Sequence, residues 1–172
     1  MDTKLRHQVL ELKVENRYAE AIELVRPWAA SGVVAARVML ARMADEAGID
    51  DDEAAAIVDA AHIEVEPLDI LGHLELHSAY EMRLGNADYE VQAARSFEHL
   101  SAAAVAGADD AYSFQVAIRY HHGAIAVPVD LAQARKWYRT SIQQGYSDAQ
   151  LMLDSLKSGD GVHRAALKTT GH

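Results

Sequence analysis

The sequence predicts an all-α fold, a right-handed α/α superhelical solenoid of about four helix-turn-helix repeats. Three observations predict it. Glycines recur at a fixed period, alanines follow one set of them at a fixed spacing, and no segment alternates with period two for long enough to form a strand. The clearest repeat lies between Gly107 and Gly145, where two helix-like segments flank Gly123 and a proline-bearing loop.

The glycines form two series that keep step with each other. The first contains Gly32, Gly107 and Gly145, and the second contains Gly48, Gly85, Gly123 and Gly161 with steps of 37, 38 and 38 residues. The first series lacks one member near position 69 or 70. Helices commonly end in a left-handed residue, which glycine reaches without steric cost. Four residues after each member of the first series stands an alanine, at Ala36, Ala111 and Ala149, which favours close helix packing.

The first half of the chain predicts five helices from apolar spacing and caps. They cover residues 3–15, 16–31, 34–47, 52–62 and 68–82. Asn16 is expected to cap the second helix, and Pro27 to kink it because proline removes a backbone donor. One of Asp50, Asp51 and Asp52 is expected to cap the fourth.

The second half predicts four more helices, each opened by a capping residue. Asp88 precedes a helix that reaches Ala106, and Asp109 or Asp110 precedes one that reaches His122. Asp130 opens the helix that ends at Gly145, and Ser147 or Asp148 opens the last long one. We expect residues 1–162 to form the repeat domain and 163–172 a C-terminal tail, either a frayed end or a capping turn.

The pattern Asp130-x3-Ala134-x2-Trp137-Tyr138-x6-Gly145-x3-Ala149-x3-Leu153 resembles the Sel-one-like repeat (SLR), a bacterial and eukaryotic relative of the tetratricopeptide repeat. The segment from Tyr18 through Pro27-Trp28 to Ala36 is similar to the opening unit of such arrays. Middle units depart from the pattern, since His99-Leu100 replaces the Trp-Tyr pair and Ile125-Ala126 replaces a usual Gly-Val. The resemblance implies a helical superhelix that binds proteins, with no catalysis and no cofactor.

Composition narrows the class of protein. The 172 residues, half of them apolar, suffice for one globular domain. The chain has no cysteine, so it has neither a disulfide framework nor a thiolate metal site. The first 16 residues lack the apolar run of a signal peptide, and no stretch has the length of a membrane span. A soluble cytoplasmic protein is therefore expected.

Negative charge is concentrated in one quarter of the sequence. Residues 43–82, the acidic block, contain twelve Asp and Glu and no Lys or Arg, while the other residues hold 14 acids against 16 bases. This distribution argues against nucleic acid, which requires a basic surface. The acidic block is either a solvated face with helix-start acids or a docking surface for a basic partner. Its IDDDE stretch lacks the spacing of a calcium loop.

Three sets of residues suggest chemistry. His73 and His77 lie four apart on one helix face, as in a zinc site, but Glu75 points away and no second ligand cluster is apparent; solvated or interface histidines are the simpler interpretation. His121-His122 suit a helix C-terminus, where positive imidazoles are favoured. Trp137 and Tyr138 are expected in the core.

The sequence as a whole predicts a non-enzymatic adaptor or scaffold that binds one basic protein through the solenoid groove and an acidic surface. The partner-binding candidates are Arg37, His77, Tyr112, Arg119, Asp50, Asp51, Asp52 and Glu53. A narrower alternative is an immunity or anti-effector protein that neutralises a basic toxin. Two others are a metal-dependent hydrolase centred on His73 and His77, and a self-assembling protein whose open solenoid ends stack.

Overall fold

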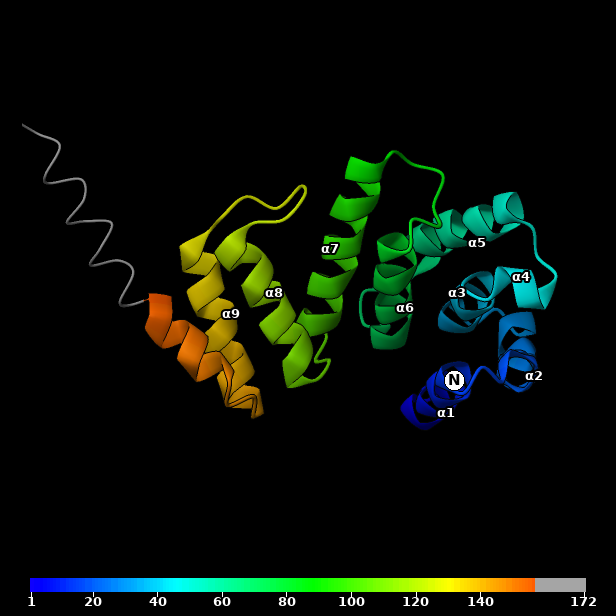
Figure 1. Cartoon of the computed structure of the whole chain (residues 1–172), viewed down its shortest axis with the longest axis horizontal. Helices are drawn as coiled ribbons and strands as arrows, with labels where there is room; N and C mark the ends of the chain where they lie inside the picture. Colours follow the sequence, from blue (N-terminus) through cyan, green and yellow to red (C-terminus); the bar gives the residue numbers. More distant parts are fainter. Residues whose placement is uncertain (157–172) are drawn as a thin grey trace, which may run out of the picture. The chain divides into compact units, whose positions relative to one another are not determined.

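The computed structural model describes residues 1–156, and these residues form helices joined by short turns, with no strand among them (Figure 1). The helices are α1 (Thr3–Val14), α2 (Tyr18–Ala30), α3 (Val34–Ala41), α4 (Ala44–Ala47), α5 (Asp51–Glu64), α6 (Ile70–Glu81), α7 (Tyr89–Val105), α8 (Asp110–His122) and α9 (Leu131–Gln144). Residues 149–156 are also helical. The all-α prediction is confirmed. The predicted tail, 163–172, lies outside the described residues.

The chain divides into two compact units, which separate at Gly107 and Ala108. Unit 1 contains α1 to α7, and unit 2 contains α8, α9 and the helical residues 149–156. The sequence predicts a single repeat domain over residues 1–162. That the two units form one continuous right-handed superhelix stays a prediction.

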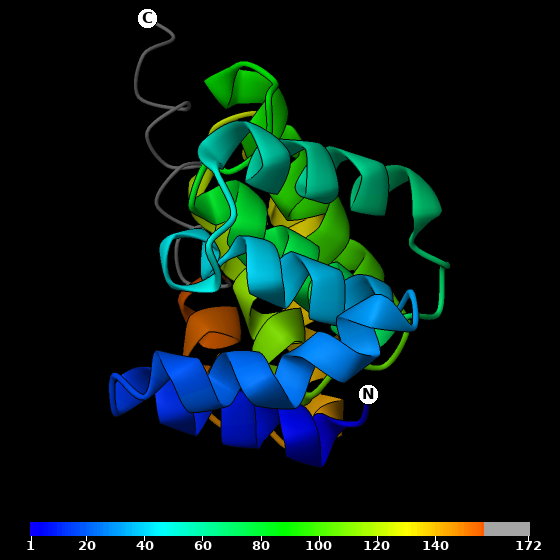
Figure 2. The same cartoon turned by 90° about the vertical axis from the view of Figure 1, so that its right-hand side faces the viewer.

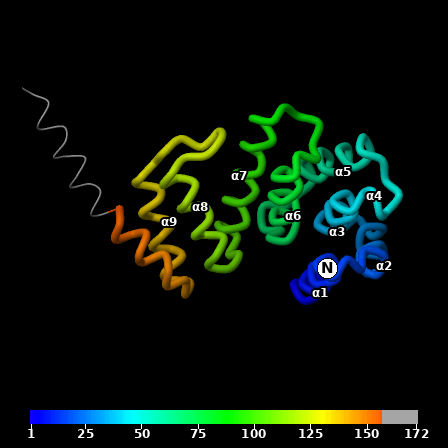
Figure 3. Tube along the Cα trace, in the orientation of Figure 1, coloured from blue at the N-terminus to red at the C-terminus, as the bar shows by residue number. Residues whose placement is uncertain are grey.

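Unit 1 is a stack of helices that pack on one another in turn. α1 packs on α2, α2 on α3, α3 on α5 and α6, and α6 on α7 (Figures 2 and 3). α3 separates two apolar clusters: Met39 belongs to the cluster with α1 and α2, and Val38 to the cluster with α5 and α6. Burial on both faces explains why α3 is almost entirely apolar.

Unit 2 is a helix hairpin closed by a third helical stretch. α8 and α9 pack together, and Ala149, Leu153 and Leu156 join their core. Tyr138 of α9 is fully buried at its centre, whereas Trp137 is only partly buried, so the core prediction holds more strongly for the tyrosine. The loop between α8 and α9 contains a lone bridge between Ala124 and Val127.

Most of the predicted helix caps are confirmed. The Asp50 carboxylate accepts from the backbone N–H of Glu53 at 2.8 Å, and Asp109 and Asp130 cap α8 and α9 in the same way. The Asn16 prediction is wrong. Asn16 has a φ of 57° and follows the end of α1, while Arg17 occupies the N-cap position of α2. Asparagine tolerates this left-handed conformation better than most residues, which explains its presence there.

Within residues 1–156, the two glycine series mark helix ends with one exception. Gly145 closes α9 in the left-handed region with a φ of 118°, as the period predicts. Gly85 has no positive φ, and Arg83 takes the left-handed position after α6 with a φ of 62°. A Cβ on Gly85 would lie 2.7 Å from the Tyr80 ring. Glycine is therefore required there because the loop runs against a buried aromatic side chain.

The predicted helix 34–47 is interrupted. The helix α3 ends at Ala41 and the short α4 begins at Ala44, so Arg42 and Met43 form a break that contains neither glycine nor proline. Met43 is buried, and the Arg42 side chain pairs with Glu75 of α6. The contacts of these two residues are with distant parts of the chain, which local propensity does not encode.

Candidate functional site

The helix α6 is buried on nearly all of its circumference, and polar clusters occupy two of its faces. Eight of its residues are buried, including His73, Glu75 and His77. The histidines face α5 and α7, while Glu75 faces arginines from α1 and α3. Buried polar side chains require partners, so these clusters are candidate sites.

His62, His99 and His73 form a chain of three imidazoles, which we call the histidine relay. His62 Nδ1 lies 2.9 Å from His99 Nε2, and His99 Nδ1 lies 2.9 Å from His73 Nδ1. The three residues come from α5, α7 and α6 respectively. The Tyr80 ring is stacked on His99, with 5.8 Å between ring centroids and 4° between planes. The relay thus joins three helices through side chains alone.

Burial lowers the pKa of all three relay imidazoles. The pKa of His99 falls to about 3, chiefly through desolvation and also through the neighbouring His73 and His62. Desolvation also lowers the pKa of His62 and of His73. The backbone carbonyls of Glu66 and Pro67 raise the pKa of His73, but by less than burial lowers it.

His77 belongs to a separate buried network. Its Nδ1 lies 2.9 Å from Ser96 Oγ, and that hydroxyl donates to Glu81 Oε1 at 2.6 Å. His77 is 9% exposed and His73 is 6% exposed. The expectation that these histidines are solvated is wrong, because α7 covers the face of α6 that carries them. His77 is therefore a poor candidate for direct contact with a partner.

The metal-centre hypothesis finds no ligand set in residues 1–156. No group of three or more His, Cys, Asp or Glu in this range is arranged to hold a metal ion. The Nδ1 atoms of His73 and His77 already contact His99 and Ser96. Glu75 lies on a different face of α6, as its sequence spacing predicts.

Glu75 is a fully buried carboxylate held by two arginines. Arg6 Nε of α1 donates to Glu75 Oε1 at 2.7 Å, and Arg42 Nη1 donates to Oε2. Burial lowers the pKa of Lys13, and the charge of Arg42 lowers it further, while Glu75 opposes the change. One carboxylate thus pairs with two arginines, Arg6 of α1 and Arg42 after the end of α3, and attracts Lys13 as well.

Fewer acids of the acidic block are available on the surface than the sequence suggests. Four of its twelve acids have polar or cationic partners from elsewhere: Asp59 with Arg95, Glu64 with Arg37, Glu75 with Arg6 and Arg42, and Glu81 with Ser96. Asp50, Asp51, Asp52 and Glu53 remain exposed at the start of α5. These four follow the preference of a helix N-terminus for negative charge, so their clustering has a structural cause as well.

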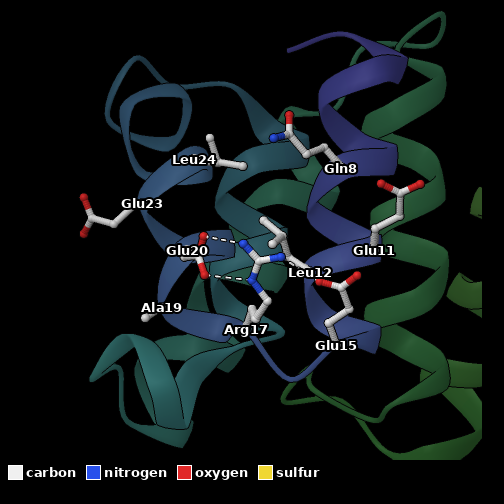
Figure 4. Close-up of a pocket in the computed structure, with 9 residues that line it drawn as sticks. All are labelled: Gln8, Glu11, Leu12, Glu15, Arg17, Ala19, Glu20, Glu23 and Leu24. Atoms are coloured by element: carbon white, nitrogen blue, oxygen red, sulfur yellow. Dashed lines mark hydrogen bonds and ion pairs between the residues drawn. The ribbon is translucent and has the colours of Figure 1, made fainter.

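An open groove of about 610 Å³ lies between α1 and α2 (Figure 4). Its polar lining is mostly acidic, with Glu11, Glu15, Glu20 and Glu23, and its apolar lining is Leu12, Ala19 and Leu24. Gln8 and Arg17 complete it. This groove was not predicted from the sequence. Its acids lie outside the acidic block, in a stretch whose Lys and Arg offset their charge.

The one cation of the groove lining, Arg17, is bound within it. Its guanidinium donates from Nε and Nη2 to the two oxygens of Glu20, at 2.8 and 2.7 Å, and from Nη1 to Glu15 at 2.7 Å (Figure 4). Glu11 and Glu23 are exposed and form no ion pair in the part of the chain that the structure describes. The lining therefore carries a net negative charge.

The other predicted contact residues belong to both units. Arg37 of α3 pairs with Glu64 of α5, which places it in unit 1. Tyr112 and Arg119 belong to α8 of unit 2, where both are partly buried. Their roles in binding stay predictions.

His121 and His122 end α8, as the sequence predicts, but the first imidazole is less basic than expected. Burial lowers the pKa of His121, and the stacked His122 lowers it further. The His121 Nδ1 lies 3.1 Å from the hydroxyl of Tyr138, so this residue takes part in the packing of unit 2.

No family model and no curated protein matches the chain. Among solved structures, the chain is similar to a protective antigen present in uropathogenic Escherichia coli strains that displays an SLR fold. The match has 22% sequence identity and a TM-score of 0.34, and it covers 81% of this chain and 37% of that chain. This chain therefore spans little more than a third of the antigen's length. The named fold is the one that the repeat pattern of the sequence resembles.

Within residues 1–156, none of the helices combines the length and the hydropathy that crossing a membrane requires.

Proposed function

We propose that this protein is a non-enzymatic protein-binding module, and that the groove between α1 and α2 takes a basic amphipathic helix of its partner. The groove itself carries the proposal, because its glutamates stand beside buried Leu12 and partly buried Leu24. An amphipathic helix binds such a groove through apolar residues at i, i+3, i+4 and i+7. Its Lys and Arg would meet the glutamates.

The contacts of Arg17 within the groove support a partner that carries arginine. Its contact with Glu20 is bidentate, the geometry that matches guanidinium to carboxylate. The side chains of Arg17 and Glu20 are 50% and 60% exposed. An exposed pair of this kind contributes only about 0–1 kcal/mol, so an arginine of a partner can displace Arg17 at small cost. The exposed acids at the start of α5 would add long-range attraction.

The test is the affinity of a labelled leucine- and lysine-rich helical peptide for the full chain, measured by fluorescence anisotropy at low and high salt. We expect binding at low salt that weakens strongly near 0.3 M, a range in which screening shortens electrostatic interactions to about 5–6 Å. Glu11→Gln with Glu23→Gln should weaken binding about tenfold, since each exposed charge contributes up to about 1 kcal/mol.

Glu66→Gln with Glu90→Gln is the matched control, because both are exposed carboxylates of unit 1 outside the groove. The control changes net charge equally and should leave affinity within about twofold. Equal weakening by the two double variants would show attraction to net charge alone and would contradict the proposal.

A further inference from the structure

The histidine relay limits how many protons its three imidazoles can hold. Each N···N contact of 2.9 Å has room for one hydrogen, which is donated by one ring and accepted by the other. The relay has two such contacts and two outer nitrogens. Fully protonated imidazoles carry a hydrogen on both nitrogens, so two adjacent ones cannot keep their contact.

Both outer nitrogens of the relay can carry a hydrogen. The backbone carbonyls of Glu66 and Pro67 favour the protonated form of His73, although burial, the larger effect, lowers its pKa. With one hydrogen in each contact and one on each outer nitrogen, the relay holds four hydrogens, one more than three neutral imidazoles carry. A second added proton must break a contact.

We propose that the histidine relay is a pH-sensitive latch that holds α5 and α7 against α6 at neutral pH and releases them in mildly acidic conditions. The latch is internal to unit 1 and is independent of the groove between α1 and α2. Its bistable element is the packing of three helices around His99, which is 2% exposed.

Other charged and titratable groups face the relay from all three helices. They are Asp59 from α5, Asp69, His77 and Tyr80 from α6, and Arg95 and Glu98 from α7.

Of the three neighbouring acids, Asp59 and Asp69 already have partners, and Glu98 of α7 raises the pKa of His62 and of His73 by less than burial lowers it. Asp59 is already bound by Arg95 at 2.9 Å and by Asn86 at 3.1 Å, and Asp69 caps α6 through the N–H of Gly72. Burial raises the pKa of Tyr80 to about 12, so its hydroxyl stays neutral. The acids favour charged imidazoles, but desolvation dominates the pKa of His62 and of His73 and lowers both.

The direction of the pH effect follows from proton binding. An unfolded histidine has a pKa near 6.5, whereas burial lowers the pKa of His99 to about 3 in the folded chain. Below about pH 6.5 the opened state binds more protons than the closed one, so stability falls as the pH falls. From pH 7 to pH 5, each excluded proton raises the opening equilibrium constant about 25-fold.

The test is amide hydrogen exchange of the full chain at pH 7 and pH 5, expressed as protection so that the intrinsic pH dependence cancels. We expect protection in α5, α6 and α7 to fall at least about 25-fold, with a smaller fall in α8 and α9. His99→Gln, which cannot be charged, should reduce the fall in α5 to α7, and His122→Gln in unit 2 should not. An equal fall in both units, or an unchanged response of His99→Gln, would overturn the proposal.

Because His99→Gln itself weakens packing, a second measurement uses the unaltered chain. The imidazole ¹⁵N shifts of His99 should keep their neutral values in the closed state at pH 5 and become those of the charged form only as α5 to α7 open. A charged His99 in a chain that retains full protection would overturn the latch.

Discussion

Replacing Glu75 by Gln is expected to destabilise unit 1 by about 3–5 kcal/mol, the usual cost of removing one partner from a buried ion pair. Glu75 is fully buried, and the side chains of Arg6 and Arg42 are only 11% and 13% exposed. The substitution removes the anion that both guanidinium groups contact in a poorly solvated site. The loss should appear as lower amide protection in α1, α3 and α6, measured on the full chain.

Glu64→Gln is the matched control, because it removes the same charge from a pair that is more exposed. The side chains of Arg37 and Glu64 are 27% and 50% exposed, so this pair should contribute less than about 1 kcal/mol. Equal effects of the two substitutions would show that the buried carboxylate does not hold α1 and α3 against α6.

Replacing Tyr138 by Ala is expected to destabilise unit 2 by about 3–5 kcal/mol, because the loss of a large buried ring leaves a cavity. Tyr138 is fully buried, and its ring centroid lies 5.7 Å from that of Phe114. Alanine and leucine side chains from α8, α9 and residues 149–156 surround it. Amide protection in α8 and α9 of the full chain measures the effect.

Tyr138→Phe separates the ring from its hydroxyl. It keeps the packing and removes the hydrogen bond of 3.1 Å to His121, which should cost about 1 kcal/mol. If the phenylalanine variant lost as much protection as the alanine variant, the contact with His121 and not ring burial would stabilise the unit.

Several helix ends were predictable because they depend on neighbouring residues. Asp50 and Asp130 cap helices through contacts within three residues, and Gly145 closes α9 through its own backbone conformation. The break between α3 and α4 at Arg42 could not be predicted from neighbouring residues. Its side chain meets Glu75, which lies 33 residues further along the chain.

The candidate sites were predictable only in part, because their residues come from different repeats. His73 and His77 drew attention to α6, but the partners of His73 in the relay come from α5 and α7. The sequence did contain an indication of the relay. His62 and His99 are 37 residues apart, which is one repeat step and places them at equivalent positions of successive repeats. Two histidines at equivalent repeat positions indicate a shared contact more directly than a metal-like i, i+4 pair.

Charge counting along the chain did not indicate the acidic groove. Counted along the chain, residues 43–82 hold twelve acids, yet several of them meet cations that the chain brings from α1, α3 and α7. The groove between α1 and α2 gathers glutamates from two helices whose sequence also contains Lys and Arg. The local net charge of these two segments therefore did not indicate the groove.

The most direct test of the protein-binding proposal is a hydrogen-exchange footprint of the full chain with and without the basic helical peptide. The account predicts added protection in residues 8–24, which line the groove on α1 and α2, and little change in α8 and α9. Protection confined to α8 and α9, or binding that leaves residues 8–24 unchanged, would contradict it.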